Sequence, residues 1–174
     1  MMVIVVMGVS GSGKTTVGVR LAERLGTGYA DADAFHPPVN VEKMAAGIPL
    51  TDEDRAPWLR STASWIADRG ERGGVVSCSA LRRRYRDVLR TGGDVWFLHL
   101  AGSMALLTAR IQARTDHFMP VSLLESQFAD LEPLESDEFG RVVQVSNSVA
   151  GVVTEAVAAY RGARADIEAR RAGR

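Results

Sequence analysis

The chain has 174 residues, of which 46% are hydrophobic and 24% are charged, and its formal net charge is zero. This composition suits a soluble globular chain with one core, so we expect residues 1–174 to form a single domain. Nucleic-acid binders usually carry a basic excess, and the balanced charge argues against a nucleic-acid partner. The lone Cys78 cannot form an intrachain disulfide, and the apolar run at residues 1–7 is too short to cross a bilayer. We therefore expect a cytoplasmic protein with no membrane association.

Apolar runs and helical patterns alternate along the chain. Residues 1–7 are continuously apolar and rich in β-branched side chains, which is typical of a buried parallel strand. In chain order we expect a strand at 1–7, a loop at 8–13, a helix at 15–25, a strand at 29–31, helical turns at 40–47, a helix at 57–69, a strand at 73–79, a helix at 80–90, a strand at 95–100, helices at 103–114 and 121–131, a polar loop at 132–140, a strand at 141–145 and a helix at 149–160.

Strands that alternate with helices predict an α/β fold, in which a parallel sheet is covered by helices on both faces. The acidic residues of 51–55 are expected to separate the turns at 40–47 from the helix that begins at Pro57. The tail at 161–174 carries five arginines and two acidic residues. We interpret it as a solvated, partly frayed helix end, with an anion-binding arm as the alternative.

The segment GVSGSGKT, residues 8–15, matches the phosphate-binding loop pattern G-x-x-x-x-G-K-[ST] and lies between an apolar strand and a helix. Small residues let successive backbone N–H groups turn inward around a phosphate, and the helix that follows adds its positive end. We expect Lys14 to bridge the β- and γ-phosphates of ATP and the Thr15 hydroxyl to bind Mg²⁺. The predicted nucleotide-binding residues of this loop are Gly8, Val9, Ser10, Gly11, Ser12, Gly13, Lys14, Thr15 and Thr16.

The phosphate-binding loop defines a nucleotide binder and leaves its reaction open. A guanine-binding N-K-x-D motif is absent, and no apolar strand ends in the acidic residue that motor-type ATPases carry. These features favour a small-molecule kinase over a nucleotide-dependent switch or binding protein. Within this class the loop does not define the acceptor, and a kinase of a small acid or polyol such as shikimate is one alternative.

Two aspartates, Asp31 and Asp33, follow the short strand at 29–31. The carboxyl ends of parallel strands line the ligand crevice of such sheets, so both carboxylates are expected beside the phosphate-binding loop. We predict that Asp31 binds Mg²⁺ through water and that Asp33 orients the hydroxyl that attacks the γ-phosphate. The alternative is that the two aspartates cap the next helix or line a turn.

Four segments together resemble the gluconokinase family: MGVSGSGKTT, DADAFHPPVNVEKMAAGIPLTDEDRAPWL, SCSALRRRYRDVLR and ARTDHFMPVSLLESQFADLEP. The resemblance covers the chain up to about Tyr160 and is most specific in the run that begins at His36. It implies a small P-loop kinase with a five-stranded parallel sheet in the order 2-3-1-4-5. It also implies ATP-dependent phosphorylation of D-gluconate at its 6-hydroxyl, with Mg²⁺ as cofactor. The product, 6-phospho-D-gluconate, would feed the pentose phosphate or Entner–Doudoroff route, and the enzyme would be a homodimer. Departures from the family pattern occur at Ala32, Asp116 and Ser146.

The family's substrate lobe would correspond to residues 34–70 of this chain. Gluconate is a polyol with a terminal carboxylate, so its pocket needs cations at one end and hydrogen-bonding groups along its length. His36, Lys43 and Arg55 are the candidates, because an arginine fork matches a carboxylate and a lysine supplies a point charge. The alternatives are that His36 only fixes its loop, that Lys43 lies on an exposed helix face, and that Arg55 pairs with Asp52 or Asp54. Trp58 is expected in the core.

Two further segments supply candidates. Ser79 follows a strand, and Arg82 and Arg86 share a helix face at i, i+4 spacing, so we expect one or both arginines to contact substrate or phosphate. Arg110, Arg114 and His117 flank a connection at 114–122 that the resemblance identifies as a lid. It implies that Arg114 neutralises the transferring phosphoryl group and that Arg110 contacts the nucleotide, although a basic helix end could also explain either arginine. The remaining substrate candidates are His117 and Gln127.

Overall fold

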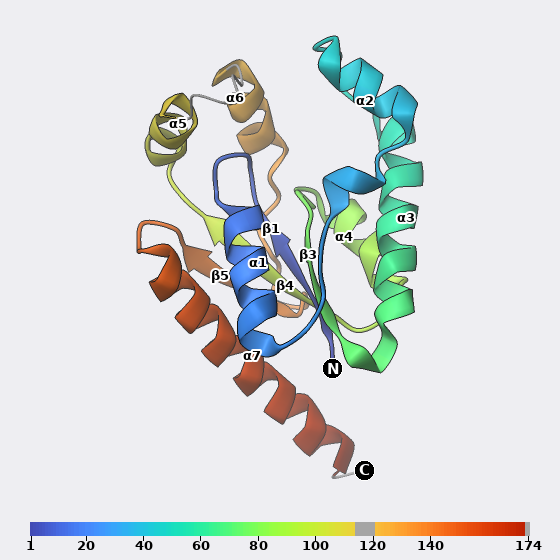
Figure 1. Cartoon of the computed structure of the whole chain (residues 1–174), viewed down its shortest axis with the longest axis vertical. Coiled ribbons are helices and arrows are strands. Elements are labelled where there is room, and N and C mark those ends of the chain that lie inside the picture. The colour runs from blue at the N-terminus through green and yellow to red at the C-terminus, as the bar shows by residue number, and fades with distance from the viewer. Residues whose placement is uncertain (114–120, 173–174) are drawn as a thin grey trace.

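The protein, described from a computed structural model for residues 1–113 and 121–172, contains one five-stranded sheet in the order β2-β3-β1-β4-β5 (Figure 1). All four strand pairs are parallel, which confirms the predicted fold class and strand order. The strands are β1 (Val3–Met7), β2 (Tyr29–Asp31), β3 (Gly74–Ser77), β4 (Val95–Ala101) and β5 (Gly140–Gln144). The helices are α1 (Lys14–Leu25), α2 (Pro38–Ala45), α3 (Asp52–Arg69), α4 (Arg83–Arg90), α5 (Met104–Gln112), α6 (Val121–Asp130) and α7 (Val149–Ala172), with 3₁₀ turns η1 (Ala32–Phe35) and η2 (Gly70–Arg72).

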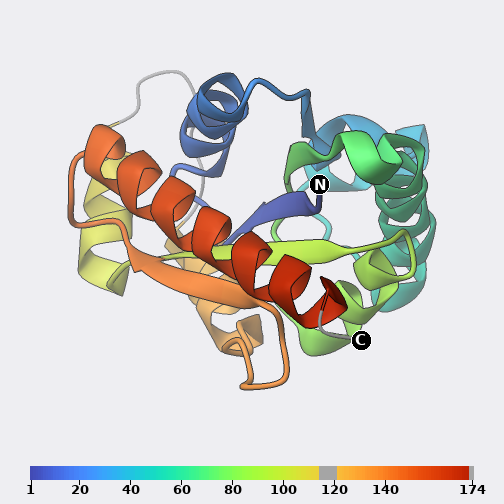
Figure 2. The ribbon, with the colours of Figure 1, turned by 90° about the horizontal axis from the view of Figure 1, so that it is seen from below.

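Helices cover the sheet on both faces, and this burial explains the uninterrupted apolar sequence of β1. On one face, Val6 and Leu98 pack with residues of α1 and α7, including Leu21 and Ala156. On the other face, residues of α3 and α4 join Val5 and Phe97 in a second cluster that includes Trp58 and Leu89. Figure 2 shows the sheet between these two helical layers.

The register of the strands brings their carboxyl ends to one edge of the sheet. Val5 lies opposite Val76 of β3 and Phe97 of β4, so β1, β3 and β4 run level with one another. The loop after β1, the turn after β2 and the loop after β3 therefore share this edge. Figure 1 places α2 and α6 on opposite sides of the same end of the molecule.

Helix α3 begins at Asp52, five residues before the predicted start at Pro57. The acidic run that suggested a break is the first turn of the helix. Thr51 Oγ1 accepts a hydrogen bond from the Asp54 N–H, and the Asp54 carboxylate accepts one from the Thr51 N–H, which together form a capping box. Acidic side chains in the first turn also suit the positive end of the helix dipole.

Helix α4 starts later than predicted, at Arg83. Ala80 is buried and has φ of 43°, in the left-handed region, and Arg82 is extended as the N-cap. Residues 80–82 therefore turn the chain away from β3 before the helix can form.

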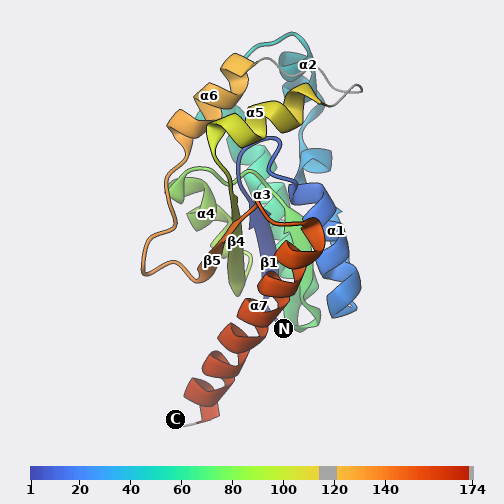
Figure 3. The same cartoon turned by 90° about the vertical axis from the view of Figure 1, so that its left-hand side faces the viewer.

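Helix α7 is twice as long as predicted: it has 24 residues and runs past the end of the sheet (Figure 3). Tyr160 is buried, and its hydroxyl donates a hydrogen bond of 3.0 Å to the Met2 carbonyl. Ala163 and Ile167, further along α7, are partly buried against the same core. The tail expected to be a solvated helix end is helical to Ala172. Across the described ranges, no helix has the length and apolarity needed to cross a membrane.

Arg86 of α4 is fully buried and forms an ion pair with Glu138, whose side chain is also fully buried. The two bonds between them measure 2.6 and 2.7 Å. The guanidinium also donates to four backbone carbonyls, those of Ala80, Leu81, Glu132 and Pro133. This pair joins α4 to the loop before β5, which the sequence pattern predicted only as a polar surface segment.

His99 of β4 is 6% exposed, and no group in the described part of the chain bonds to its Nδ1. Burial, with the positive charge of Arg86 as a smaller cause, lowers the pKa of His99. Because the unfolded histidine binds a proton near pH 6.5 and the folded one only at lower pH, acidification through this range favours unfolding.

We expect the free energy of unfolding to fall as pH drops from 7.5 to 5.5, with His99 contributing at most about 1.4 kcal/mol per pH unit. Urea denaturation at several pH values measures this slope. The substitution His99→Leu should make the slope shallower, and an unchanged slope would contradict the assignment to His99.

Candidate active site

The phosphate-binding loop connects β1 to α1 and depends on glycine at its two ends. Gly8 has φ of 140°, and a Cβ there would lie 2.7 Å from the Leu100 carbonyl oxygen, so no larger residue fits. Gly13 has φ of 91° and is the N-cap of α1, where a Cβ would meet nothing within 4 Å. The loop therefore opens at the amino end of α1, where the backbone N–H groups and the positive end of the helix dipole favour an anion.

Side chains around the loop hold it in shape. Lys14 Nζ donates to the Val9 carbonyl at 3.1 Å, so the ammonium lies across the loop. The Ser10 N–H donates to Gln127 Oε1 of α6 at 2.7 Å. Ser12 is buried, and its Oγ has no hydrogen-bond partner among the described residues. Gln127, predicted to contact substrate, is thus placed against the phosphate-binding loop.

Thr15 and Asp31 meet beside the start of α1. Thr15 Oγ1 donates to Asp31 Oδ2 at 3.1 Å, and the Tyr29 hydroxyl lies 3.3 Å from the same oxygen. One hydroxyl and one carboxylate suit Mg²⁺, which keeps several waters and binds nucleotide phosphates. In residues 1–113 and 121–172, no group of three or more His, Cys, Asp or Glu side chains could enclose a metal by itself. The residues present fit a magnesium ion shared with phosphate.

Asp33 lies in η1, directly after β2. Its N–H donates to Asp31 Oδ1 at 3.1 Å, which makes Asp31 the cap of this turn. Trp58 Nε1 donates to the Ala32 carbonyl at 2.6 Å and ties the turn to α3. Partial desolvation raises the pKa of Asp33, and the charge of Asp31 raises it further, while Lys14 acts in the opposite direction. The side chain is exposed, so a bound hydroxyl could reach its carboxylate.

His36 follows η1 and stacks on Trp58, with ring centroids 4.4 Å apart and planes at 11°. Its Nδ1 lies 3.4 Å from Nδ2 of Asn40, a residue of α2 that is 1% exposed. Asn40 was not predicted as a site residue. Its signal was a polar side chain near the start of a short helix, which by itself does not distinguish a buried anchor from a surface residue.

The two positively charged side chains predicted in the substrate lobe, Lys43 and Arg55, form ion pairs of different closeness. Lys43 Nζ lies 2.7 Å from Asp54 Oδ1, and this bond is the main cause that lowers the pKa of Asp54. Arg55 Nη1 is 4.0 Å from Asp52 and 3.4 Å from the Tyr85 hydroxyl, which itself donates to Asp52 at 2.5 Å. Arg55 is therefore paired more weakly than Lys43 and is better able to receive a carboxylate.

The three candidates after β3 have separate positions. The Ser79 carbonyl accepts the Gly8 N–H at 3.3 Å, which links this loop to the phosphate-binding loop. Arg82 pairs with Asp130 of α6. Arg86 lies in its buried pair with Glu138, closed off from the crevice, which differs from the prediction that it shares an accessible face with Arg82.

The amino end of α4 is also occupied from within the chain. The Glu132 carboxylate accepts a hydrogen bond from the Arg83 N–H. A carboxylate of the protein therefore already occupies this helix end, which leaves it unsuited to binding an anionic substrate. The Arg83 guanidinium also forms ion pairs with Asp137 and Glu135.

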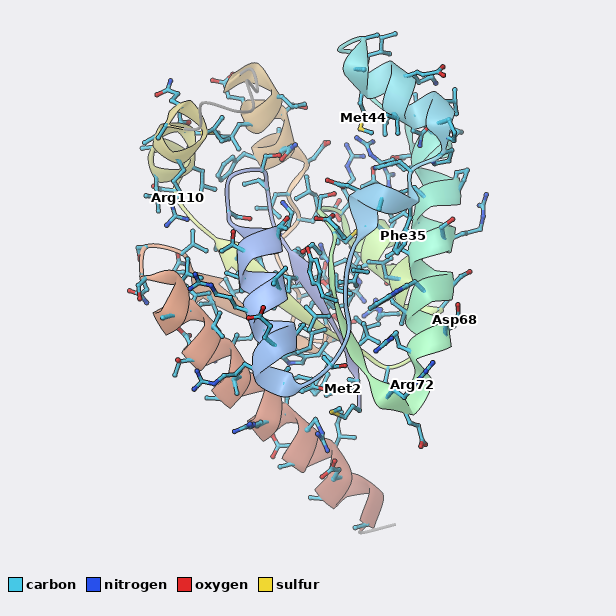
Figure 4. All side chains as sticks on the ribbon, in the orientation of Figure 1. Met2, Phe35, Met44, Asp68, Arg72 and Arg110 are labelled. Atoms are coloured by element: carbon cyan, nitrogen blue, oxygen red, sulfur yellow. The ribbon has the colours of Figure 1, made fainter. Side chains whose placement is uncertain are left out.

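A cavity of about 280 Å³ lies on the α7 side of the phosphate-binding loop. Arg110 lines it and donates a hydrogen bond to the Val145 carbonyl. Figure 4 shows Arg110 between α5 and the loop that follows β5. The position beside the loop suits the nucleoside part of ATP. Other lining residues include Gly11, Ser12, Gly13, Thr16, Asn147 and Val149, of which Asn147 and Val149 were not predicted as site residues.

Arg114, His117 and the predicted lid up to residue 120 lie outside the described residues. A larger hollow of about 460 Å³ lies at the opposite, amino edge of the sheet, next to Val3 and Asp94. It lacks every residue of the phosphate-binding loop, so we place the active site at the carboxyl edge.

A phosphate-binding loop at the carboxyl edge of a 2-3-1-4-5 parallel sheet, with an aspartate beside it, defines a small P-loop kinase. A family model described as shikimate kinase matches residues 10–157. Gluconokinase of Gluconobacter oxydans (strain 621H) is 52% identical over 147 residues, covering 82% of this chain and 81% of that protein. The chain belongs to the gluconokinase family.

Solved structures agree with this placement. The crystal structure of a gluconokinase from Sinorhizobium meliloti 1021 is 44% identical and has a TM-score of 0.90, covering 97% of each chain. Shikimate kinase from Aquifex aeolicus vf5 has a TM-score of 0.60 at 16% identity, covering 92% of this chain and 97% of that one. The second similarity concerns the fold alone.

Proposed function

We propose that this chain transfers the γ-phosphoryl group of ATP to the 6-hydroxyl of D-gluconate, giving ADP and 6-phospho-D-gluconate. The position of Asp33 carries the proposal, because η1 brings this carboxylate to the same sheet edge as the phosphate-binding loop. Membership of the gluconokinase family supplies the acceptor.

The loop residues bind and position the nucleotide. The backbone N–H groups at the start of α1 receive the β-phosphate, and Lys14 moves from the Val9 carbonyl to bridge the β- and γ-phosphates. Mg²⁺ bound at Thr15, and through water at Asp31, would neutralise phosphate charge. Arg110 and the cavity it lines receive the nucleoside.

Asp33 accepts a hydrogen bond from the 6-hydroxyl and aligns it with the γ-phosphorus. Phosphoryl transfer depends mainly on positioning and charge stabilisation, so one orienting carboxylate suffices. Arg55 binds the carboxylate at the other end of gluconate, and Lys43, which is paired with the neighbouring Asp54, adds positive charge to the same lobe. Arg114 and His117 are proposed to act from a lid at 114–122, with residues 34–70 as the substrate lobe.

We further propose that the enzyme is cytoplasmic, that each chain forms a single domain, and that two chains form a homodimer. These assignments follow from the family resemblance and the composition. Size-exclusion chromatography with light scattering would test the dimer.

The function is tested by a coupled ADP-release assay across D-gluconate, shikimate, other sugar acids and nucleoside monophosphates. We expect turnover with gluconate well above the no-acceptor background and none with nucleoside monophosphates. Preference for shikimate would favour the family-model description instead, and ADP release without any acceptor would indicate a nucleotide hydrolase.

A further inference from the structure

The orientation of the Asn40 side chain is fixed by a backbone carbonyl. Its Nδ2 lies 2.7 Å from the Asp54 carbonyl oxygen, and Asn40 is 1% exposed. A carbonyl oxygen only accepts hydrogen bonds, so the amide nitrogen and not the amide oxygen must face it. The alternative orientation would place two acceptors in contact inside the protein, which costs free energy.

The same nitrogen decides the tautomer of His36. Nδ2 carries two hydrogens, one directed at Asp54 and one available to His36 Nδ1 at 3.4 Å. Because a donor faces it, Nδ1 must be the unprotonated acceptor, and a neutral imidazole then carries its proton on Nε2. Burial lowers the pKa of His36, and the Arg55 charge adds to this while Asp33 opposes it.

The ring is also held in one plane. Trp58 stacks on it at 4.4 Å and, through Nε1, holds the Ala32 carbonyl of the turn that carries Asp33. The His36 N–H donates to the Asp33 carbonyl at 3.4 Å, so the two side chains leave one short turn. Within residues 1–113 and 121–172, no acceptor is bonded to His36 Nε2. The imidazole thus has a fixed orientation and leaves the same short turn as the Asp33 side chain.

We propose that Asn40 is a positioning residue that keeps the proton of His36 on Nε2. The Nε2–H group then donates a hydrogen bond to the substrate oxygen on the carbon next to the one that carries the reacting hydroxyl. The inference rests on the proposed function, under which the reacting group is the 6-hydroxyl and its neighbour is the 5-hydroxyl of gluconate. A neutral histidine protonated on Nδ1 would instead present the lone pair of Nε2 to the 5-hydroxyl. His36 therefore selects acceptors with an oxygen on the adjacent carbon.

The tautomer is tested by ¹⁵N NMR of the imidazole in the full chain, without any turnover. We expect Nε2 protonated and Nδ1 unprotonated in the parent protein. Asn40→Asp replaces the donor with an acceptor and should move the proton to Nδ1 or charge the ring. A parent spectrum with Nδ1 protonated would overturn the proposal whether or not the variant folds.

The specificity role is tested with gluconate and an analogue that lacks the 5-hydroxyl. His36→Phe keeps a ring on Trp58 but removes the donor, so kcat/KM for gluconate should fall roughly ten- to a hundredfold, with little change for the analogue. His36→Gln places an amide N–H near the Nε2 position and should recover part of the loss. Equal losses on both acceptors would overturn the role.

Thr62→Val is the matched control for both experiments. Thr62 is a buried polar residue of α3 whose hydroxyl donates to the Trp58 carbonyl at 3.0 Å, away from His36 Nδ1. It should leave the tautomer and the acceptor preference unchanged. If the parent protein turns over neither acceptor, the proposed function fails together with the specificity role, while the NMR result still decides the tautomer.

Discussion

Replacing Asp33 with asparagine is expected to lower kcat for gluconate by about a hundred- to ten-thousandfold, with nucleotide affinity nearly unchanged. The amide keeps the shape of the side chain but cannot accept the 6-hydroxyl as a carboxylate does. Steady-state kinetics and isothermal titration with a non-hydrolysable ATP analogue measure the two effects separately.

A second readout distinguishes a catalytic role from a structural one. Desolvation and the Asp31 charge raise the pKa of Asp33, so the folded protein disfavours this charge. We expect Asp33→Asn to leave the melting temperature unchanged or raise it by ~1–3 °C. Asp166→Asn, on an exposed part of α7, is the control and should alter neither property. Near-normal turnover in Asp33→Asn would assign the orienting role to another residue.

Replacing Arg86 with methionine is expected to destabilise the protein by about 3–5 kcal/mol. The change leaves the fully buried Glu138 carboxylate without its ion-pair partner and removes the hydrogen-bond donor of four backbone carbonyls. The melting temperature should fall by about 10 °C, measured by differential scanning calorimetry and urea denaturation.

The double substitution Arg86→Met, Glu138→Leu should recover part of this loss, because it removes the stranded charge as well. Arg164→Met provides a matched control, since Arg164 and Glu168 form an exposed i, i+4 pair on α7. Such an exposed pair contributes little to stability, because solvent screens its charges. A loss in Arg86→Met no larger than in Arg164→Met would contradict the buried-anchor interpretation.

Local patterns were sufficient to predict much of this protein. The strand at Tyr29–Asp31 and the helix capped by Ser103 were predicted because each depends on neighbouring residues. The phosphate-binding loop is equally local, since its shape follows from glycines at fixed spacing. The start of α3 was also readable in principle, because Thr51 and Asp54 have the spacing of a capping box.

The environment of Arg86 could not be predicted in this way. Its partner Glu138 lies 52 positions further along the chain, in a segment with no periodic pattern. Helical spacing alone gave Arg82 and Arg86 the same face, but Arg82 is an extended N-cap and not part of the helix. The position of Asn40 is a similar case, because its carbonyl partner belongs to Asp54 of another helix.

The three tryptophans occupy very different surroundings. Trp96 packs against Tyr160, and Trp65 lies beneath Arg69, both away from the crevice. Trp58 alone touches the turn that carries Asp33 and the ring of His36. In a Trp65→Phe, Trp96→Phe background we therefore expect the fluorescence of Trp58 to change when an acceptor binds at the proposed site, so binding could be followed without an added dye.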